Sequence, residues 1–591
     1  MGRLLFCNNE DWNKQLKLIF KRNGLLEVYS DMCMTVYNKR YVRNVNHIQR
    51  GDNYLIITGT WAYDDNNDDM LGAVYNDLFN ENHSLQYVRN KMIGSYCIAY
   101  KKEDVVRIVV DETHTYAIYY YEGEKGTVVT NTYFHVERVV KEDIDRDSFV
   151  TKLAKNGYNS NRTPFKSIFR LHEEDVIEYN TLTNTCIIAK CQVNETAYDF
   201  KNRSEALKTL YAQMEKEAGM HERLKTKKFL FISGGLDSRL RLAIDLKYSR
   251  DVKLGYWKGT DSITNGTLED EKMNRKIAEQ EGLQTTIFDV GKSYASCMES
   301  ITMDEIDRYG EYVSIYSHNS KWFGIFDKLA TMDIQEVQFG YDPDILRDLS
   351  SINNSFHDEY HLLDLVNNAC LRSGVFKRVM RCADIENVVL EDVRIKHRIH
   401  PEKALSKELA CDLFNYSRFD QGTAMINSVQ ESYYCLPFFY SRKLWDIIRS
   451  IPYDWKIDSM VSVNMLKYDY PKLLHLPIYT QRHYAYYHEE TNTIHSSWKY
   501  TLLKKLQPYL IDTKIYSVLY THFLEPLFFA HNKGNNELFS ICLKYLSKSK
   551  ILNKSNVKLR DNLEHKGFDL AGLCGIAAYV KAVEILTSEN E

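Results

Sequence analysis

The sequence contains no CxxC pair, no long basic run and no apolar run of membrane-spanning length. Its 12 cysteines are scattered, and the closest spacing, between Cys186 and Cys191, matches neither a zinc ribbon nor a redox motif. We therefore expect reduced and mostly buried thiols. The N-terminal segment MGRLLFCNNEDW lacks the basic and apolar stretches of a signal peptide, and no window reaches the roughly 18 apolar residues of a membrane span. These absences predict a cytoplasmic protein without a membrane partner.

The charge pattern disfavours nucleic acid as a partner. The formal net charge is -4, and no stretch of lysine and arginine is dense enough to neutralise a phosphate backbone. Hydrophobic residues make up 44% and charged residues 26%, which is the balance of a globular protein. The 43 tyrosines are expected to pack in sheets and at domain interfaces, although aromatic rings can also line a binding groove.

A chain of 591 residues is too long for one ordinary hydrophobic core. The pattern of apolar and polar residues also changes along the chain. The first part, to about residue 195, contains short β-type runs joined by polar turns: 54–63, 94–100, 105–112 and 115–123. After residue 200, strand-like and helix-like segments alternate, which predicts a parallel sheet with crossover helices. From about residue 355 helical periodicity dominates, and the apolar tail 571–586 is predicted to be a packed helix.

The segment with the most specific chemistry is the apolar run 229–232, which ends in SGGLDS and leads into a helix pattern. Gly234 and Gly235 allow the backbone to approach a bound anion closely, and N–H groups at a helix N-terminus form a cradle for phosphate oxygens. Asp237 is expected to hold Mg²⁺, which neutralises polyphosphate charge. The loop lacks the lysine of GxxxxGK[ST] and is no Walker motif. The alternative is a plain glycine turn with a serine cap.

SGGLDS resembles the pyrophosphate-binding loop of the ATP pyrophosphatase fold, which occurs in asparagine synthetases, β-lactam synthetases, lasso peptide cyclases and some tRNA-modifying enzymes. As a family these enzymes cleave ATP between the α and β phosphates. The resemblance implies ATP and Mg²⁺ as cofactors. It also implies that the following residues contact the nucleotide: Ile232, Ser233, Gly234, Gly235, Leu236, Asp237 and Ser238.

Further segments, in their order along residues 90 to 480, resemble the asparagine synthetase branch of this fold. Residues 94–132 are similar to the end of that family's N-terminal domain. KLGYWKG, followed by KIAEQEGLQTTIFDV, is similar to the strand, helix and strand after the loop, which implies that Leu254 lies beside the adenine. Residues 435–458 are similar to the PFLD stretch and a helix that ends at a proline.

VQFGYDPDIL, residues 337–346, resembles the GxGSDEL segment of that branch. This similarity implies that Phe339 and Gly340 border the nucleotide and that Asp344 is the second Mg²⁺ carboxylate. Tyr341 stands where asparagine synthetases carry a glutamate and β-lactam synthetases a tyrosine. A tyrosine with its ordinary pKa of about 10 is a poor base at neutral pH and needs a partner.

The resemblance therefore implies that Tyr341, with a glutamate, removes a proton from the attacking amine. Glu386 and Glu391 are the candidates for that glutamate. It also implies a late lysine that stabilises charge on the adenylate and the acyl oxyanion. Lys467 is the first candidate and Lys472 the second. Solvated surface positions are the alternative for all four side chains.

The glutamine-hydrolysing members of this family carry a nucleophilic cysteine at position 2, where this chain has Gly2. Cys7 is internal and is expected to be a core thiol. The glutamine-clamping NGEIYN-type segment is also missing, with TGTWAYDDNNDD in the comparable region. We therefore predict no glutaminase activity and a scaffold role for the first domain.

Together these patterns predict an α/β multi-domain protein. The β-type runs predict that residues 1–200 form a sheet-rich domain, and the resemblance implies that this is a degenerate Ntn-type domain similar to class II glutamine amidotransferases. Residues 201–500 are expected to form a parallel-sheet ATP pyrophosphatase domain like that of asparagine synthetases, and residues 501–591 a helical extension.

The resemblance implies an ATP-dependent ligase that adenylates a carboxylate, releases pyrophosphate and AMP, and couples the acyl group to an amine. Cyclisation of a peptide or small molecule in natural-product biosynthesis, as in macrolactam formation of the lasso type, is the leading version. An amidotransferase that uses free ammonia on an amino acid or sugar acid is one alternative, and an ATP-binding pseudoenzyme is another. The acidic balance disfavours a tRNA-modifying enzyme. A partner protein that delivers a peptide, and a homodimer, are compatible with the sequence.

Overall fold

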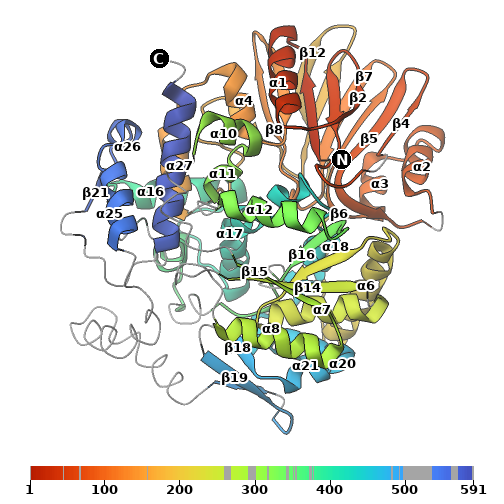
Figure 1. The fold of residues 1–591 in the computed structure, drawn as a ribbon, viewed down its shortest axis with the longest axis vertical. Coiled ribbons are helices and arrows are strands. Elements are labelled where there is room, and N and C mark those ends of the chain that lie inside the picture. Colours follow the sequence, from red (N-terminus) through yellow and green to blue (C-terminus); the bar gives the residue numbers. More distant parts are fainter. Residues whose placement is uncertain are drawn as a thin grey trace.

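The structure is a computed structural model and shows mixed α/β architecture. It describes residues 2–43, 46–65, 68–155, 157–249, 251–258, 268–289, 301–315, 319–340, 345–349, 352, 356–371, 376, 379–480, 483–491, 493–496, 536–560, 563 and 570–588. Two six-stranded antiparallel sheets come from the N-terminal part, and a four-stranded parallel sheet follows them along the chain. In Figure 1 the antiparallel sheets lie at the upper right and the parallel sheet lies below them.

The two antiparallel sheets pack face to face. The first has the order β10-β8-β9-β1-β3-β2; its strands are β1 (Arg3–Cys7), β2 (Glu27–Ser30), β3 (Met34–Tyr37), β8 (Tyr119–Gly123), β9 (Gly126–Thr130) and β10 (Ile168–Arg170). The second has the order β12-β11-β7-β6-β5-β4; its strands are β4 (His47–Arg50), β5 (Asn53–Tyr63), β6 (Met92–Lys102), β7 (Val105–Val110), β11 (Asp175–Asn180) and β12 (Thr185–Lys190). Phe6 and Val36 from one sheet share a buried core with Ile56 and Ile108 from the other.

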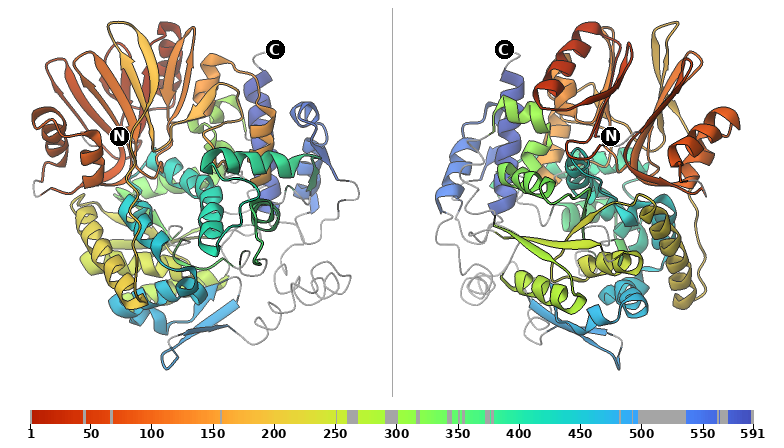
Figure 2. Two further views of the ribbon diagram at one scale, coloured as in Figure 1. Left: turned by 180° about the vertical axis from the view of Figure 1, so that it is seen from behind. Right: turned by 45° about the vertical axis from the view of Figure 1, so that its right-hand side comes forward.

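Helices cover the outer faces of both sheets. Leu16 of α1 (Glu10–Arg22) and Phe134 of α4 (Tyr133–Val140) are buried with residues of the first sheet. Val74 of α2 (Met70–Tyr75) and Val88 of α3 (Leu85–Lys91) are buried with residues of the second. The result is a layered arrangement of helices, sheet, sheet and helices, seen edge-on in the right view of Figure 2.

The alternation of side chains along β5 explains this arrangement. Tyr54 and Ile56 face the core between the sheets, whereas Leu55 and Ile57 face the core under α2 and α3. Successive side chains of a strand point to opposite faces, so an uninterrupted apolar run such as YLII serves a sheet that is covered on both sides. β5 pairs with β6 from Tyr54 to Tyr63, which fixes the register between them.

Three of the four predicted β-runs form strands near their expected bounds, and the fourth begins later. The run expected over 115–123 is paired as a strand only from Tyr119. The side chain of Asp111 accepts hydrogen bonds from the backbone N–H groups of Thr115 and Tyr116, both at 2.9 Å. This carboxylate therefore holds a turn where propensity alone favours a strand.

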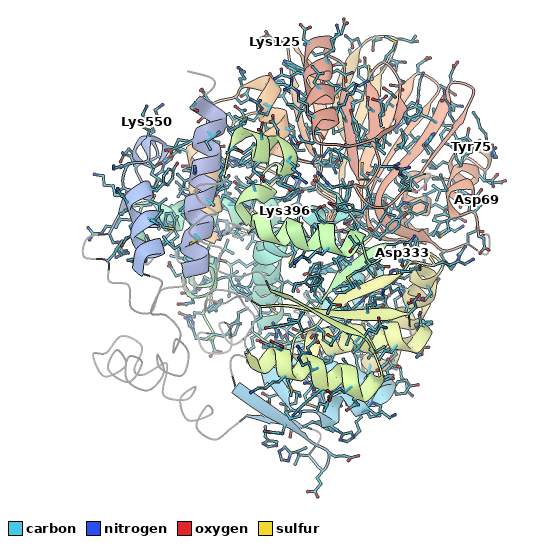
Figure 3. All side chains as sticks on the ribbon, viewed as in Figure 1. Asp69, Tyr75, Lys125, Asp333, Lys396 and Lys550 are labelled. Atoms are coloured by element: carbon cyan, nitrogen blue, oxygen red, sulfur yellow. The ribbon has the colours of Figure 1, made fainter. Side chains whose placement is uncertain are left out.

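The parallel sheet has the order β15-β14-β13-β16. Its strands are β13 (Lys228–Phe231), β14 (Val252–Lys258), β15 (Thr285–Asp289) and β16 (Glu336–Phe339). Helix α6 (Arg203–Glu222) precedes the sheet, and α7 (Leu236–Tyr248) and α8 (Leu268–Glu281) follow β13 and β14. At the amino end of the sheet, Asp333 in the turn before β16 pairs with Lys227 before β13 (Figure 3).

The helical region after the parallel sheet includes α16 (Ile385–His397), α17 (Lys407–Gln430), α18 (Arg442–Ser450), α20 (Met460–Asp469), α21 (Lys472–His475), α25 (Asn536–Leu546), α26 (Lys550–Lys554) and α27 (Leu570–Ser588). The apolar tail forms α27, which packs against α4, α11 (Tyr312–Ile315) and α25. Tyr579 of α27 stacks on Phe134 of α4 with ring centroids 6.3 Å apart. No described helix is both long and apolar enough to cross a membrane.

Two small sheets interrupt the region in which helices were expected. β18 (Ile478–Thr480), β19 (His483–His488) and β20 (Thr493–Ser496) form an antiparallel sheet. The run HYAYYH of β19 is aromatic and follows Pro477, so it favours a strand over a helix. A second pair joins β17 (Met380–Arg381) to β21 (Lys558–Leu559), a contact between distant segments that no local pattern predicts.

The amino end of β1 docks against the segment that follows α17. Arg3, only 1% exposed, forms an ion pair with Glu431. The backbone N–H groups of Arg40 and Tyr41 donate to the carbonyl oxygens of Glu431 and Ser432 at 3.0 and 3.2 Å. The antiparallel sheets and the C-terminal half are therefore joined by a buried, polar junction.

We expect Arg3→Met to destabilise the protein by about 3–5 kcal/mol, because removal of one partner of a buried ion pair leaves the other charge uncompensated. The measurement is the free energy of unfolding from urea titration. Lys14→Met is the control, since Lys14 pairs with Glu10 while its side chain remains 68% exposed. Equal stability of the two variants would contradict the importance of the junction.

Candidate functional site

The SGGLDS loop lies at the carboxyl end of β13 and leads directly into α7. β13 is an inner strand, between β14 and β16. In open parallel sheets ligands bind in the crevice outside the carboxyl ends of the strands. The local order of strand, glycine loop and helix therefore matches the prediction, although the ligand contacts of the loop residues remain a prediction.

The two serines of the loop hold its shape. The backbone N–H of Ser233 donates to Oγ of Ser238 at 3.1 Å, and that hydroxyl lies 3.1 Å from the carbonyl oxygen of Ser233. The backbone N–H of Gly235 lies 3.3 Å from Oγ of Ser233. Gly235 is the N-cap residue of α7 and provides no side-chain cap. The backbone N–H groups in the first turn of α7 therefore receive no side-chain acceptor from the N-cap residue. Backbone N–H groups of this kind at a helix N-terminus favour the binding of an anion.

Arg239 places a positive charge beneath the loop. Its guanidinium is fully buried and donates to the carbonyl oxygens of Gly234, Leu473 and Leu476 at 3.0, 2.7 and 2.9 Å, and also to that of Pro477. Burial lowers the pKa of Arg239 to about 10. Carbonyl oxygens orient the guanidinium but do not neutralise it, so its field favours an anion at the loop.

Asp270 at the start of α8 is a loop contact that the sequence did not single out. Its carboxylate accepts a hydrogen bond from the backbone N–H of Gly234 at 2.9 Å. Four residues later, Nδ2 of Asn274 lies 3.4 and 3.2 Å from the carbonyl oxygens of Ile232 and Gly255. One face of α8 therefore supports the loop. In the sequence, the i, i+4 spacing of Asp270 and Asn274 was the pattern that could have indicated this shared face.

Asp237 forms an ion pair with Arg347, with Oδ2 and Nη1 3.3 Å apart. The carboxylate side chain is 21% exposed, so solvent reaches it at the start of α7. Asp237 and Asp270 both lie at the loop, and oxygen ligands of this kind suit Mg²⁺. A cation at Asp237 would compete with Arg347 for the same oxygen.

The carboxyl end of β16 comes very close to the loop. A Cβ atom at Gly340 would lie 2.6 Å from the Cα and the N atom of Ser238, closer than real Cβ contacts. The neighbouring Phe339 stacks on Phe231 with ring centroids 5.3 Å apart and is buried. Leu254 is fully buried and lies in register with Leu230. Gly340 thus borders the loop directly, whereas Phe339 and Leu254 lie within the core around it.

Lys467, another predicted catalytic residue, is not brought to the loop, and two further predicted site residues cannot be placed. Tyr341 and Asp344 lie outside the described residues. Lys467 is exposed on α20, two residues before Asp469, whose carboxylate pairs with Lys247 at 3.1 Å. Lys247 is near the carboxyl end of α7, and a 13-residue helix is about 20 Å long. Lys467 therefore lies at the end of α7 away from the loop, and its catalytic role remains a prediction.

The alternatives named for these roles differ in position. Lys472 is exposed on α21 and precedes Leu473, whose carbonyl oxygen is bound by Arg239 beneath the loop. Its position therefore favours Lys472 over Lys467 for the predicted role of the lysine at the adenylate. Glu386 and Glu391 belong to α16, which packs against α5 (Arg146–Lys155) of the N-terminal part. Glu391 forms an ion pair with Arg394 at 2.6 Å.

The space around Gly2, the position compared above with a nucleophilic cysteine, is closed. Gly2 is buried, and a Cβ atom there would lie 2.8 Å from the carbonyl oxygen of Glu431 and 3.0 Å from Cα of Lys39. Cys7 is buried in the core, and burial raises the pKa of its thiol to about 12. A thiol with this pKa carries little thiolate at neutral pH, so Cys7 is a poor nucleophile.

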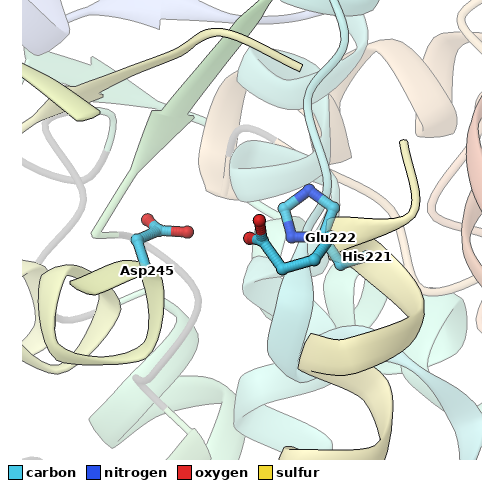
Figure 4. A group of neighbouring side chains, drawn as sticks. All are labelled: His221, Glu222 and Asp245. Atoms are coloured by element: carbon cyan, nitrogen blue, oxygen red, sulfur yellow. The ribbon is translucent and has the colours of Figure 1, made fainter. Parts of the chain in front are cut away.

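A second polar cluster lies at the opposite, amino end of the parallel sheet (Figure 4). His221, Glu222 and Asp245 bring three potential ligand atoms within 4.8 Å of one another. Lys228 pairs with both Glu222 and Asp245, and Arg241 lies 3.4 Å from Asp245. Because two cations already compensate these carboxylates, the cluster serves as a buried ion-pair network between α6, α7 and β13.

Comparison with known proteins gives only distant likenesses. No protein-family model and no curated protein matches this chain. A glutamine-dependent NAD+ synthetase from Acinetobacter baumannii in complex with ADP overlaps 34% of this chain and 42% of its own, at 15% identity and a TM-score of 0.17. Glutamine phosphoribosylpyrophosphate amidotransferase from B. subtilis, complexed with ADP and GMP, overlaps 51% and 65%, at 10% identity and a TM-score of 0.15.

A third solved structure, described as the allosteric regulatory enzyme of purine biosynthesis, overlaps 42% of this chain and 61% of its own, at 10% identity and a TM-score of 0.16. The matched part is less than two thirds of each of these three proteins. Overlaps with such TM-scores establish neither a shared fold nor a shared activity.

We expect Gly340→Ala to cost about 1–3 kcal/mol in stability, because the added methyl group meets the fixed backbone of Ser238. The same displacement should weaken nucleotide binding at the loop. Urea unfolding and titration with a fluorescent ATP analogue measure the two effects.

Gly219→Ala is the matched control, because a Cβ atom at this position of α6 meets nothing within 4 Å. Alanine there should raise stability by up to about 1 kcal/mol and leave nucleotide binding unchanged. Wild-type behaviour of Gly340→Ala in both measurements would show that the approach of β16 to the loop is not constraining.

Proposed function

We propose that this protein is an ATP-dependent ligase that converts a substrate carboxylate to its adenylate and then forms an amide bond, with release of AMP and pyrophosphate. The observation that supports it best is the SGGLDS loop, held over the buried guanidinium of Arg239 at the start of α7. An anion at this loop would gain from the backbone N–H groups, the helix dipole and the buried cation together.

The positions of the described side chains support the following proposed roles. The loop backbone binds the pyrophosphate part of ATP, and Ser233 and Ser238 keep the loop in shape by their mutual hydrogen bonds. Asp237 and Asp270 offer carboxylate oxygens for Mg²⁺, together with Asp344 as the sequence implies. When bound, Mg²⁺ would neutralise the developing charge on the leaving pyrophosphate. Arg347, released from Asp237, can then pair with a phosphate oxygen.

The source of nitrogen is proposed to be an amine or ammonia, not glutamine. Gly2 supports this proposal, because the backbone of Glu431 fills the space that a cysteine side chain would need there. We favour intramolecular cyclisation of a peptide or small molecule in natural-product biosynthesis. In this reaction Tyr341 and a glutamate would act together as the general base, and Lys467 or Lys472 would stabilise charge on the adenylate. The same proposal includes a partner protein that delivers a peptide substrate. It also includes assembly of the chain as a homodimer.

A second candidate is an amidotransferase that uses free ammonia on an amino acid or a sugar acid. The same loop and the same closed position at Gly2 support it. The loop bears on ATP and Gly2 bears on the use of glutamine, so neither feature distinguishes one acid substrate from another. A third candidate, an ATP-binding pseudoenzyme with a scaffold role, draws support from the position of Lys467 at the far end of α7.

We expect Asp237→Asn to abolish pyrophosphate release from ATP and Mg²⁺, because the variant loses a carboxylate ligand at the loop. Wild type is first screened with pools of amino acids, sugar acids and peptides, and a coupled phosphate assay after pyrophosphatase treatment measures release. Asp333→Asn is the control, since its carboxylate is exposed at the opposite end of the sheet.

Release with one pool, lost in Asp237→Asn but kept in Asp333→Asn, identifies the class of acid. If wild type binds ATP but releases no pyrophosphate with any pool, the ligase proposal fails in favour of the pseudoenzyme. Release that survives in Asp237→Asn would remove this residue from the metal site.

A further inference from the structure

Three histidines lie where the N-terminal layers meet α16 and α17. His114 precedes β8, His172 follows β10, and His397 is the last residue of α16. The rings of His114 and His172 are buried and stack, with centroids 4.8 Å apart and planes inclined by 14°. The ring of His397 meets the ring of Tyr416 of α17 edge to face at 4.8 Å. None of these residues belongs to the SGGLDS loop.

Lys396 of α16, labelled in Figure 3, fixes the protonation state of His172. Its Nζ atom lies 2.9 Å from Nδ1 of His172 and 3.0 Å from the carboxylate of Glu173. An ammonium group can only donate, so Nδ1 accepts and the imidazole is neutral. A proton on Nδ1 would remove this hydrogen bond and place two positive charges in contact, which is strongly unfavourable at a buried position.

The other side of α16 also requires a neutral ring, that of His397. Lys155 of α5 donates to Oδ1 of Asn159, which turns Nδ2 of this amide toward Nε2 of His397 at 3.1 Å. The amide nitrogen is a donor, so Nε2 of the ring accepts and carries no proton. A protonated imidazole has a proton on both nitrogens and would lose this hydrogen bond.

The carboxylates near these rings already pair with lysines. The three pairs are Glu173 with Lys396, Asp392 with Lys155, and Asp175 with Lys190. Glu173 also lies 2.7 Å from Nδ1 of His114, so it can compensate a proton on that ring. Arg170, which donates to the carbonyl oxygen of His114 at 2.8 Å, adds a further cation beside the stacked rings. A proton on His172 therefore adds positive charge to a place where cations are already close.

The surroundings shift the pKa of each ring in the same direction. Burial, followed by the charge of Lys396, lowers the pKa of His172 well below its usual value. The same two causes, with Lys155, lower the pKa of His397 to about 3. Burial lowers the pKa of His114 although Glu173 opposes it. Histidines in solvent have a pKa of about 6.5, so the docked arrangement binds fewer protons and loses stability as pH falls through 6.5.

The same surface carries the contacts that hold α16 to the N-terminal layers. Asp392 of α16 is buried and accepts hydrogen bonds from the backbone N–H groups of Asn159 and Ser160 at 2.8 and 3.1 Å. It also pairs with the buried Lys155 at 3.0 Å. Lys396 and Asp392 are one helical turn apart, so a movement of α16 that relieves Lys396 also strains the contacts of Asp392.

We propose that the contact between α16 and the N-terminal layers is an acid-sensitive latch, closed while His172 and His397 are neutral and opened when these rings take up protons. Opening moves Lys396 away from His172 and exposes the backbone N–H groups of Asn159 and Ser160. The latch is separate from the nucleotide loop, so it does not depend on the ligase activity.

The test is hydrogen–deuterium exchange of the full chain at pH 7.5 and pH 5.5, corrected for the intrinsic pH dependence of exchange. The reporters are the amides of Asn159 and Ser160, which Asp392 protects only while α16 is docked. In wild type we expect the open population to rise about tenfold over this interval for each histidine that takes up a proton on opening. His172→Gln keeps an acceptor for Lys396 but does not titrate, so its rise should be about tenfold smaller.

His488→Gln is the matched control, because His488 is exposed on β19 and should leave the wild-type pH dependence unchanged. Lys396→Gln provides a second arm if His172→Gln does not fold. Without the ammonium group a proton on His172 is tolerated better, so the rise at pH 5.5 should again be smaller than in wild type. The proposal is overturned if wild-type exchange does not rise at pH 5.5, or if His172→Gln or Lys396→Gln shows the same rise as His488→Gln.

Discussion

The guanidinium of Arg239 is the interaction on which the candidate site depends. It is buried at the start of α7 and binds carbonyl oxygens from two distant segments, Gly234 in the loop and residues 473–477 after α20. A buried cation is costly unless its donors are satisfied, so these carbonyl groups are held in place around it. The carbonyl dipoles stabilise this cation but carry no net charge, so a net positive charge remains beside Gly234 of the loop. The contacts that stabilise the fold at this point thus also set the charge beside the loop.

A second constraint is the junction between the N-terminal layers and the C-terminal half. Arg3 pairs with Glu431, and the backbone of Glu431 occupies the space above Gly2. The position that carries the nucleophile in glutamine-hydrolysing relatives of the resembled family is here part of an interface. The junction continues through Asn427 to a small polar cavity lined by Lys152 and Glu311. The N-terminal layers are therefore tied to the rest of the chain by polar contacts.

Several elements could be predicted because their causes are local. The strands of the parallel sheet and helix α8 follow from apolar runs and helical periodicity, and α27 follows from its apolar tail. The prediction failed where a side chain redirected the backbone, as Asp111 does before Tyr119. It also failed at β18 to β20, where aromatic residues after Pro477 form strands within a region of helical pattern. Local propensity is a weak guide when hydrogen bonds to side chains or to neighbouring strands compete with it.

By itself the sequence determined the SGGLDS loop, its place between a strand and a helix, and the glycine at position 2, because each depends on residues adjacent in the chain. Only the tertiary structure decided that Asp270 and Arg347 contact the loop, that Lys467 lies at the far end of α7, and that Lys152 and Glu311 share a cavity. These residues are separated from their partners by tens to hundreds of positions. Their proximity comes from packing of whole elements around common cores, which no short pattern encodes.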